Sequence, residues 1–303
     1  MSLLDLFCDV DDFCKVFETW AAQQQLPDKA KRGPQPRLAP SEIMTLVVHF
    51  HQAGYRDFKS YYQKHVCKHL GREFPELVSY NRFVELMPGV ALLLCAYLQS
   101  RFGSGTGIAF VDSTPLAVCH NRRIERHRVF KDLAARGKTT MGWFYGFKLH
   151  LIVNDMGELL AVHVTPGNID DRKPLPGMSK SLLGKLFGDK GYISQALFET
   201  LFERGLELVT SLRKKMKGQL MLLSDRLMLR KRFIIETITD QLKNISQIEH
   251  TRVLDKTAPE RGLSATGARP TSLSTSWPGL SPIRTKTKSR RCVSLPTSHS
   301  YPP

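Results

Sequence analysis

The chain of 303 residues is long enough for one large domain or two ordinary ones, and its hydrophobic share of 42% is enough for a packed core. Its formal net charge of +16 favours a polyanionic partner, and the excess lies after residue 100, because residues 1–100 carry 11 basic and 11 acidic side chains. A membrane span and a secretory signal are not expected, since no continuous apolar run reaches about 18 residues and acidic side chains crowd the N-terminus.

The first hundred residues are predicted to be entirely helical. Apolar residues recur at helical spacing from the N-terminus and predict one amphipathic helix that reaches about Ala30. A linker over residues 31–37 precedes a second helix, which Ser41 is expected to cap. Further helices are expected over residues 55–70 and 79–99. A small helical bundle ahead of another domain is often a DNA reader, but this one is neutral and has no basic recognition helix, so that role stays open.

From residue 107 the periodicity changes to that of strands. The turn sequence Asn154-Asp155-Met156-Gly157 predicts a hairpin, and helices are expected between and after the later strands. The predicted strands cover residues 108–111, 143–153, 159–165, 186–188 and 206–212. This order predicts an α/β domain in which helices flank a mixed sheet.

Three acidic residues occupy informative places in this pattern. Asp112 directly follows the first predicted strand, Asp189 follows the strand at 186–188, and Glu236 lies on a helix expected over residues 231–248. A carboxylate just past a buried strand is held at a sheet edge, where a carboxylate from a packed helix can meet it. Such a trio can hold two divalent cations roughly 4 Å apart, which stabilises the attacking and leaving oxygens of a phosphodiester.

Other interpretations of these acids remain open. Asp112 could be an ordinary turn residue, because Ser-Thr-Pro follows it. Asp170 or Asp171 could replace Asp189 as a ligand, although a turn and a helix N-cap are the favoured interpretation. Asp240 is the alternative to Glu236 on the same helix.

Basic side chains lie close to these acids in the sequence. Residues 121–138 carry seven basic and two acidic side chains and predict an exposed arm beside the acidic edge of the sheet. Aromatic residues near this arm, Phe130 and residues 143–145, could stack on bases, although core packing is favoured for residues 143–145. The side chains expected to bind DNA phosphates are Lys190, Lys243, Arg122, Arg123, Arg126, Arg128, Arg172 and Lys173.

Three blocks of sequence also carry a family resemblance. They are Phe110-Val111-Asp112-Ser113-Thr114, Gly188-Asp189-Lys190-Gly191-Tyr192, and Ile235-Glu236-Thr237 with Asp240-Gln241-Leu242-Lys243-Asn244. In this order they resemble the signature blocks of bacterial insertion-sequence transposases of the DDE type, above all the insertion sequence 982 family, over residues 1–252. The resemblance implies a ribonuclease-H-like catalytic domain over residues 101–252, behind an all-α N-terminal module over residues 1–100.

The resemblance further implies the chemistry and the partners. Asp112, Asp189 and Glu236 would bind two Mg²⁺ ions, with Mn²⁺ as a substitute. A metal-activated water would cut at the ends of the element, and the freed 3′-hydroxyl would attack target DNA. The implied partner is double-stranded DNA, both terminal inverted repeats and target, bound by a homodimer. The scattered cysteines, which form no Cys-x-x-Cys pair, suit the reducing bacterial cytoplasm.

The tail departs from the resemblance after Arg252. About half of residues 253–303 are Ser, Thr, Pro or Gly, which predicts a disordered basic segment where the family continues with apolar helical sequence. We interpret the tail as the product of a frameshift or truncation. The chain could then be an impaired remnant that only binds DNA as a repressor, and a nuclease that does not transpose is a further alternative.

Overall fold

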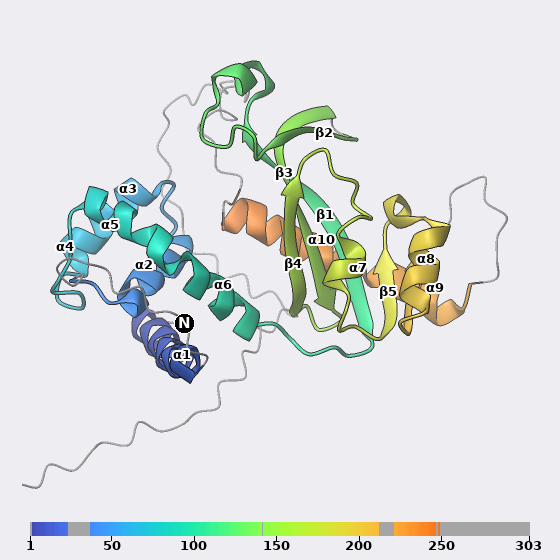
Figure 1. The fold of residues 1–303 in the computed structure, drawn as a ribbon, viewed down its shortest axis with the longest axis horizontal. Coiled ribbons are helices and arrows are strands. Elements are labelled where there is room, and N and C mark those ends of the chain that lie inside the picture. Colours follow the sequence, from blue (N-terminus) through green and yellow to red (C-terminus); the bar gives the residue numbers. More distant parts are fainter. Residues whose placement is uncertain (1, 24–36, 141, 212–220, 247, 249–303) are drawn as a thin grey trace, which may run out of the picture. The chain divides into compact units, whose positions relative to one another are not determined.

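The computed structural model describes residues 2–23, 37–140, 142–211, 221–246 and 248 (Figure 1). The predicted tail over residues 253–303, the linker over residues 31–36 and the end of the first predicted helix lie outside the described residues. The described residues before the first strand are helical and share one hydrophobic core, to which Leu6 and Phe83 contribute fully buried side chains. Their helices are α1 (Leu3–Gln23), α2 (Pro40–Gln52), α3 (Phe58–Tyr61), α4 (Cys67–His69), α5 (Tyr80–Leu86) and α6 (Ala91–Ser100).

The starts and breaks of these helices differ in detail from the prediction. Helix α2 is capped at Ala39 and not at Ser41, because Pro40 takes the first helical position and the Glu42 carboxylate accepts the Ala39 N–H at 2.7 Å. The helix expected over residues 55–70 contains a π-helical turn, Tyr62–Val66. The helix expected over residues 79–99 is broken by a 3₁₀ turn, Met87–Val90, which includes Pro88.

One helical stretch in the described part of the chain, Tyr80–Ser100, is long and apolar enough by length and composition to cross a membrane. It carries a charged pair on its first turns, Arg82 and Glu85, whose side chains are 2.9 Å apart. Phe83 and Val90 of this stretch are buried in the helical core. Core helices of water-soluble proteins share this composition, so the stretch alone does not place the chain in a membrane.

Six strands of the described chain form one sheet in the order β2-β3-β1-β5-β6, with β4 also paired to β3. The pairs β1–β3, β2–β3 and β3–β4 are antiparallel, and β1–β5 and β5–β6 are parallel. The predicted hairpin after Asn154 is confirmed, because Gly157 adopts a φ of 82° between β3 and β4. The strands are β1 (Ile108–Cys119), β2 (Ala135–Thr139), β3 (Gly142–Asn154), β4 (Leu159–Pro166), β5 (Gly184–Gly188) and β6 (Leu206–Thr210).

Helices cover both faces of this sheet. Leu175 of α7 (Leu175–Met178) and Leu197 of α8 (Gln195–Phe202) pack on one face, against Val111 and Ile152. Ile235 of α10 packs on the other face, together with side chains of α9. The helices of that second face are α9 (Leu223–Lys231) and α10 (Phe233–Asp240). Strands β4-β3-β1-β5-β6, with the first three antiparallel and the last two parallel to β1, give the ribonuclease-H-like mixed sheet that was predicted.

Two predicted boundaries near the acids were wrong. Strand β1 does not end at Val111 but continues through Asp112 to Cys119, paired with β3. Pro115 is tolerated within it, because β5 pairs with β1 only as far as Phe110 and leaves the other edge of β1 without a parallel partner there. The helix expected over residues 231–248 instead begins at Phe233 and continues into a π-helical turn, Gln241–Ile245.

Candidate active site

Asp112 and Asp189 lie side by side because of the sheet register. The parallel pairing of β1 with β5 runs up to the pair Phe110–Phe187, and two residues further along each chain come the two acids. Asp112 is in the part of β1 that only β3 still pairs, and Asp189 is the first residue after β5. The Asp189 carboxylate accepts the backbone N–H of Lys190 at 2.7 Å, which fixes its direction. The register therefore explains why these two acids meet.

Helix α10 brings the third acid towards Asp112, and the Arg232 guanidinium contacts both carboxylates. Glu236 lies in its first turn, while Ile235 next to it is buried against the sheet. The Arg232 guanidinium connects the helix to the strand: its Nη2 is 2.7 Å from Glu236 Oε1 and its Nη1 is 3.9 Å from Asp112 Oδ1. Sequence analysis overlooked Arg232, although its position four residues before Glu236 is the spacing of a helical ion pair.

The charges of the two other acids act on Asp112. The pKa of Asp112 is raised to about 6, chiefly by burial and to a smaller degree by the nearby charges of Glu236 and Asp189. The Arg232 guanidinium and the backbone N–H of Ser113 act in the opposite direction. A half-buried carboxylate with two acidic neighbours and one arginine favours a further positive charge beside it.

The donor chemistry of this site fits a hard divalent cation. Three carboxylates from β1, the end of β5 and α10 offer the oxygen ligands that Mg²⁺ prefers. Within the described ranges, no three His, Cys, Asp or Glu side chains lie together closely enough to hold a metal ion. Arg232 contacts both Asp112 and Glu236, so ion binding requires this side chain to move and the carboxylates to come closer together.

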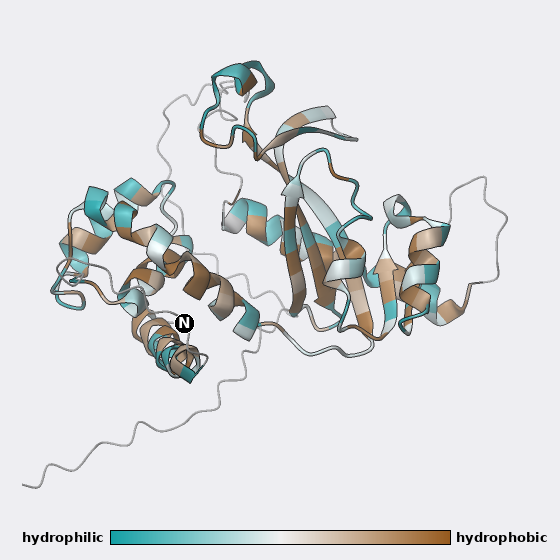
Figure 2. Ribbon diagram, in the orientation of Figure 1, coloured by the Kyte–Doolittle hydropathy of each residue, from teal (hydrophilic) through white to brown (hydrophobic). Residues whose placement is uncertain are grey.

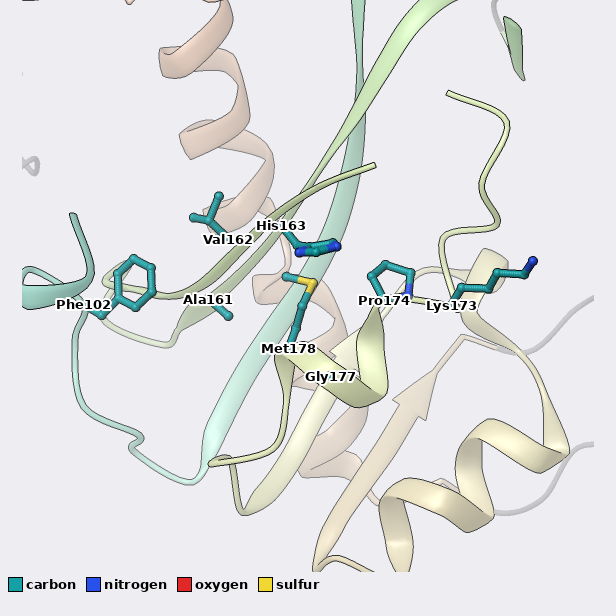
Figure 3. A pocket seen from close by; sticks show the side chains of 8 residues that line it. All are labelled: Phe102, Ala161, Val162, His163, Lys173, Pro174, Gly177 and Met178. Carbon is teal, nitrogen blue, oxygen red and sulfur yellow. The ribbon is translucent and has the colours of Figure 1, made fainter. Parts of the chain in front are cut away.

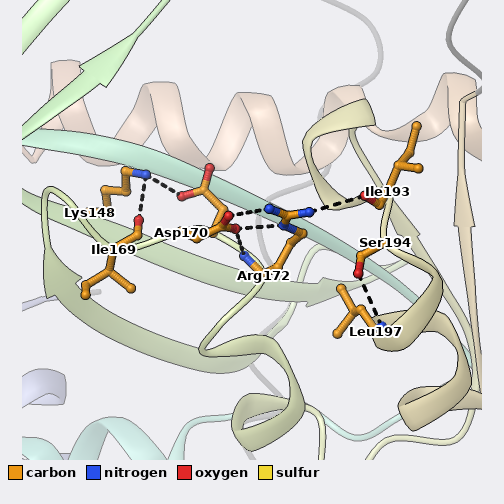
Figure 4. Close-up of polar contacts among 8 residues, drawn as sticks. Lys148, Ile169, Asp170, Arg172, Ile193, Ser194 and Leu197 are labelled. Carbon is orange, nitrogen blue, oxygen red and sulfur yellow. Dashed lines mark hydrogen bonds and ion pairs between the residues drawn. The ribbon is translucent and has the colours of Figure 1, made fainter.

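The alternative acids Asp170 and Asp171 are engaged elsewhere, and Figure 4 shows the contact of Asp170 with Arg172. Asp170 accepts bonds from the backbone N–H and the guanidinium of Arg172, and these bonds hold the pKa of Asp170 well below its usual range. Asp171 accepts a bond from Lys148 Nζ at 2.8 Å, and Lys148 also donates to the carbonyl of Ile169. These contacts form a tied turn, in agreement with the favoured interpretation.

The basic side chains predicted to bind DNA are spread over several places. Lys190 is exposed directly beside Asp189, and Lys243 lies in the π-helical turn after α10. The guanidinium of Arg172 is also 3.5 Å from the carbonyl of Ile193 (Figure 4). Lys173 lines a cavity of about 450 Å³ between β4 and α7, which none of the three acids lines (Figure 3).

The basic arm is exposed but is not next to Asp112. Arg122, Arg123, Arg126 and Arg128 are exposed on a 3₁₀ helix, Asn121–Arg126, and the loop after it, a largely hydrophilic segment in Figure 2. The arm follows Cys119, seven residues along β1 from Asp112, which is roughly 23 Å at a strand rise of about 3.3 Å. Trp143 is not packed in the core as favoured: it is 57% exposed, with Lys138 Nζ 5.7 Å from its ring centroid.

Comparison with protein families decides the identity of this domain. Residues 102–256 match the family described as "Transposase DDE domain", which is more than half of the chain. The chain belongs to the DDE transposase domain family. The matched residues of this DDE transposase include Asp112, Asp189 and Glu236, together with Arg232.

Solved structures that resemble this DDE transposase do so loosely. A piggyBac transposase, solved as a synaptic complex with hairpin DNA, has a TM-score of 0.38 and 11% identity and covers 70% of this chain. The chain spans about half, 49%, of that protein. A simian T-cell lymphotropic virus intasome in complex with the PP2A regulatory subunit B56 gamma has a TM-score of 0.22 and 13% identity, and the match covers 61% of this chain and 70% of that one. No functionally curated protein matches the chain.

Proposed function

We propose that the chain is a DNA transposase of a bacterial insertion sequence, of the insertion sequence 982 type, that cuts at element ends and joins 3′-hydroxyl ends to target DNA. The observation that supports this most is the position of Asp112 beside Asp189, with Arg232, the residue before α10, in contact with both Asp112 and Glu236. The DDE family match covers all of these residues.

In this proposal the three carboxylates hold two Mg²⁺ ions, or Mn²⁺ in their place. When bound, such ions activate a hydroxyl nucleophile and stabilise charge on the attacking and leaving oxygens. Arg232 would turn from Asp112 and Glu236 towards the DNA phosphates, because a guanidinium and a divalent ion compete for the same oxygens. Lys190, exposed beside Asp189, is placed to contact a phosphate next to the reacting bond.

The proposal also includes the partners and the parts of the chain. Residues 1–100 and 101–252 would act as a DNA-binding module and a catalytic domain, which agrees with their separate hydrophobic cores. A homodimer in the bacterial cytoplasm would hold two terminal inverted repeats and the target. We further propose that residues 253–303 come from a frameshift. If no reading frame of the encoding DNA contains the missing apolar helix, the frameshift idea is wrong.

Cleavage and strand transfer of a labelled terminal-repeat duplex test this function. With Mg²⁺ the full chain is expected to nick at the repeat end and then to join that end to a target plasmid, and Asp189→Ala is expected to do neither. Equal activity of the variant would refute the assignment of the acids. Specific binding without cleavage would identify a repressor-like remnant, and cleavage without joined products would identify a nuclease.

Replacing Arg122, Arg123, Arg126 and Arg128 with Ala is expected to weaken DNA binding. The binding constant should also depend less on salt concentration. Each phosphate contact contributes about 0.9 to the slope of log K against log salt, so the slope should become shallower by about 3 to 4. Filter binding at several salt concentrations measures this slope. Because the arm lies far along β1 from Asp112, the cleavage rate of DNA-saturated protein should stay within about twofold of wild type. An unchanged slope would remove the arm from the DNA interface.

A further inference from the structure

A buried polar cluster lies behind the acids, on the opposite face of β1. Side chains alternate along a strand, so Ser113 faces the side of Val111, which packs with α7 and α8, whereas Asp112 faces α10. His150 of β3 is the cross-strand neighbour of Ser113. Tyr192, from the short 3₁₀ helix Lys190–Tyr192 after Asp189, belongs to the same packed face.

Two polar atoms of this cluster are buried without a partner. Tyr192 is 2% exposed and His150 is 1% exposed, and in the described part of the chain neither the Tyr192 hydroxyl nor His150 Nδ1 has a hydrogen-bond partner. His150 Nε2 is engaged with Thr165 Oγ1 at 2.8 Å. Burying a hydroxyl without a hydrogen bond costs stability, so a retained one calls for an explanation in terms of what the site does.

The surroundings of the Tyr192 hydroxyl point to its role. Burial raises the pKa of Tyr192 far above its usual range, in agreement with its position in the packed core. The charges of Asp171, Asp112 and Asp189 raise the pKa further, while Ser113 lowers it. The Tyr192 side chain packs in the same cluster as Val111 of β1, on the face of that strand to which Ser113 also points.

Tyr192 also connects the two strands whose ends carry these aspartates. Its backbone N–H donates to the carbonyl of Asp189 at 3.0 Å. Its ring packs against Gly188 at the end of β5, where an added Cβ would lie 3.2 Å from the ring and 3.1 Å from Val111 Cγ1. One side chain thus spans from the last residue of β5 to the part of β1 that holds Asp112.

We propose that Tyr192 is a positioning residue for Asp112 and Asp189: when the two carboxylates close on a cation, its hydroxyl donates to Ser113 Oγ and locks β1 to β5 from the opposite face. This proposal rests on the proposed function in assuming that the acids bind metal. A small shift of β1 relative to β5 supplies the missing hydrogen bond. The metal-bound state therefore has a bond between the Tyr192 hydroxyl and Ser113 Oγ that the metal-free state does not have.

The test compares Tyr192→Phe with a matched control, Tyr62→Phe. Tyr62 is also fully buried, but its hydroxyl donates to the carbonyl of Val78 at 2.6 Å within the helical core. Full-length proteins are titrated with Mn²⁺ by calorimetry without DNA, and their thermal midpoints are measured without metal. Tyr192→Phe is expected to bind Mn²⁺ about 10-fold more weakly or worse, with an unchanged or higher thermal midpoint, because outer-shell partners of metal ligands have effects of this size.

The control and a second variant keep the proposal falsifiable. Tyr62→Phe is expected to lower the thermal midpoint and to leave Mn²⁺ affinity unchanged. Ser113→Ala should weaken Mn²⁺ binding as Tyr192→Phe does, and the double variant should add little. Wild-type Mn²⁺ affinity in Tyr192→Phe, with Asp112→Asn binding none, would overturn the positioning role alone. Wild-type affinity in Asp112→Asn would instead overturn the proposed function.

Discussion

Glu236→Gln is expected to lower Mg²⁺-dependent cleavage about 10³-fold or more, whereas Asp240→Asn, four residues further along α10, should stay within about twofold of wild type. Charge stabilisation by a bound metal is worth several kcal/mol, and each 1.36 kcal/mol is a factor of ten in rate. Glu236 contacts the same arginine as Asp112 does. Asp240 lies one turn away and is bonded to Asn244.

Single-turnover cleavage of the terminal-repeat duplex at saturating protein measures this difference. Both variants remove one negative charge from the same helix, so a general effect of charge on DNA binding would appear in both. Similar rates for the two variants, whether fast or slow, would contradict the assignment of Glu236. A slow Asp240→Asn with a fast Glu236→Gln would give the third ligand to Asp240.

Asp112→Asn is expected to inactivate the protein and yet to stabilise its metal-free fold at neutral pH. The folded-state pKa of Asp112, about 6, is above the ordinary value of 3.8, so the folded chain holds this proton more tightly than the unfolded chain does. The stability from the protonated form is fully present below about pH 4 and is lost as pH rises through about 6. Relative to wild type, the Asn variant should therefore gain about 2 kcal/mol in free energy of unfolding between pH 4 and pH 7.

Urea denaturation of both proteins at a series of pH values measures this gain. The free energies of unfolding of the variant and of wild type must be compared at each pH, because His150 titrates in the same pH range and its effect on stability has the opposite sign. Burial lowers the pKa of His150 to about 4, so its contribution to stability rises with pH. Saturating Mg²⁺ should stabilise wild type and reverse the order of the two proteins at pH 7. If the difference in free energy of unfolding between the two proteins does not change with pH, the fold does not raise the pKa of Asp112.

Sequence patterns predicted which strands and helices surround the acids better than they predicted where these elements begin and end. The hairpin at Gly157 and the strand before Asp189 followed from local turn and apolar signals. The end of β1 did not, since the sequence Ser-Thr-Pro suggests a turn. Only the sheet order shows that Pro115 sits where β1 lacks a parallel neighbour, so that its missing N–H costs no ladder bond.

The candidate site shows the same division between local and long-range information. Asp112, Asp189 and Glu236 were predicted from the residues next to them and from the family resemblance. The contact of Arg232 with Asp112 could not be predicted, because the two residues are 120 positions apart in the sequence and meet only through packing of α10. The Tyr192 hydroxyl has no hydrogen-bond partner among the described residues, and its burial likewise depends on packing between β1, β5 and the helices of one face of the sheet.

The early end of β5 has a consequence for steric access. In the described chain β1 has parallel pairing only up to Phe110, so Asp112 stands where the sheet narrows by a strand. A helical duplex is too wide to enter an enclosed pocket, but it can lie alongside such a step and present one backbone to it. One strand of the proposed DNA substrate can thus reach the carboxylates from the flank of the sheet.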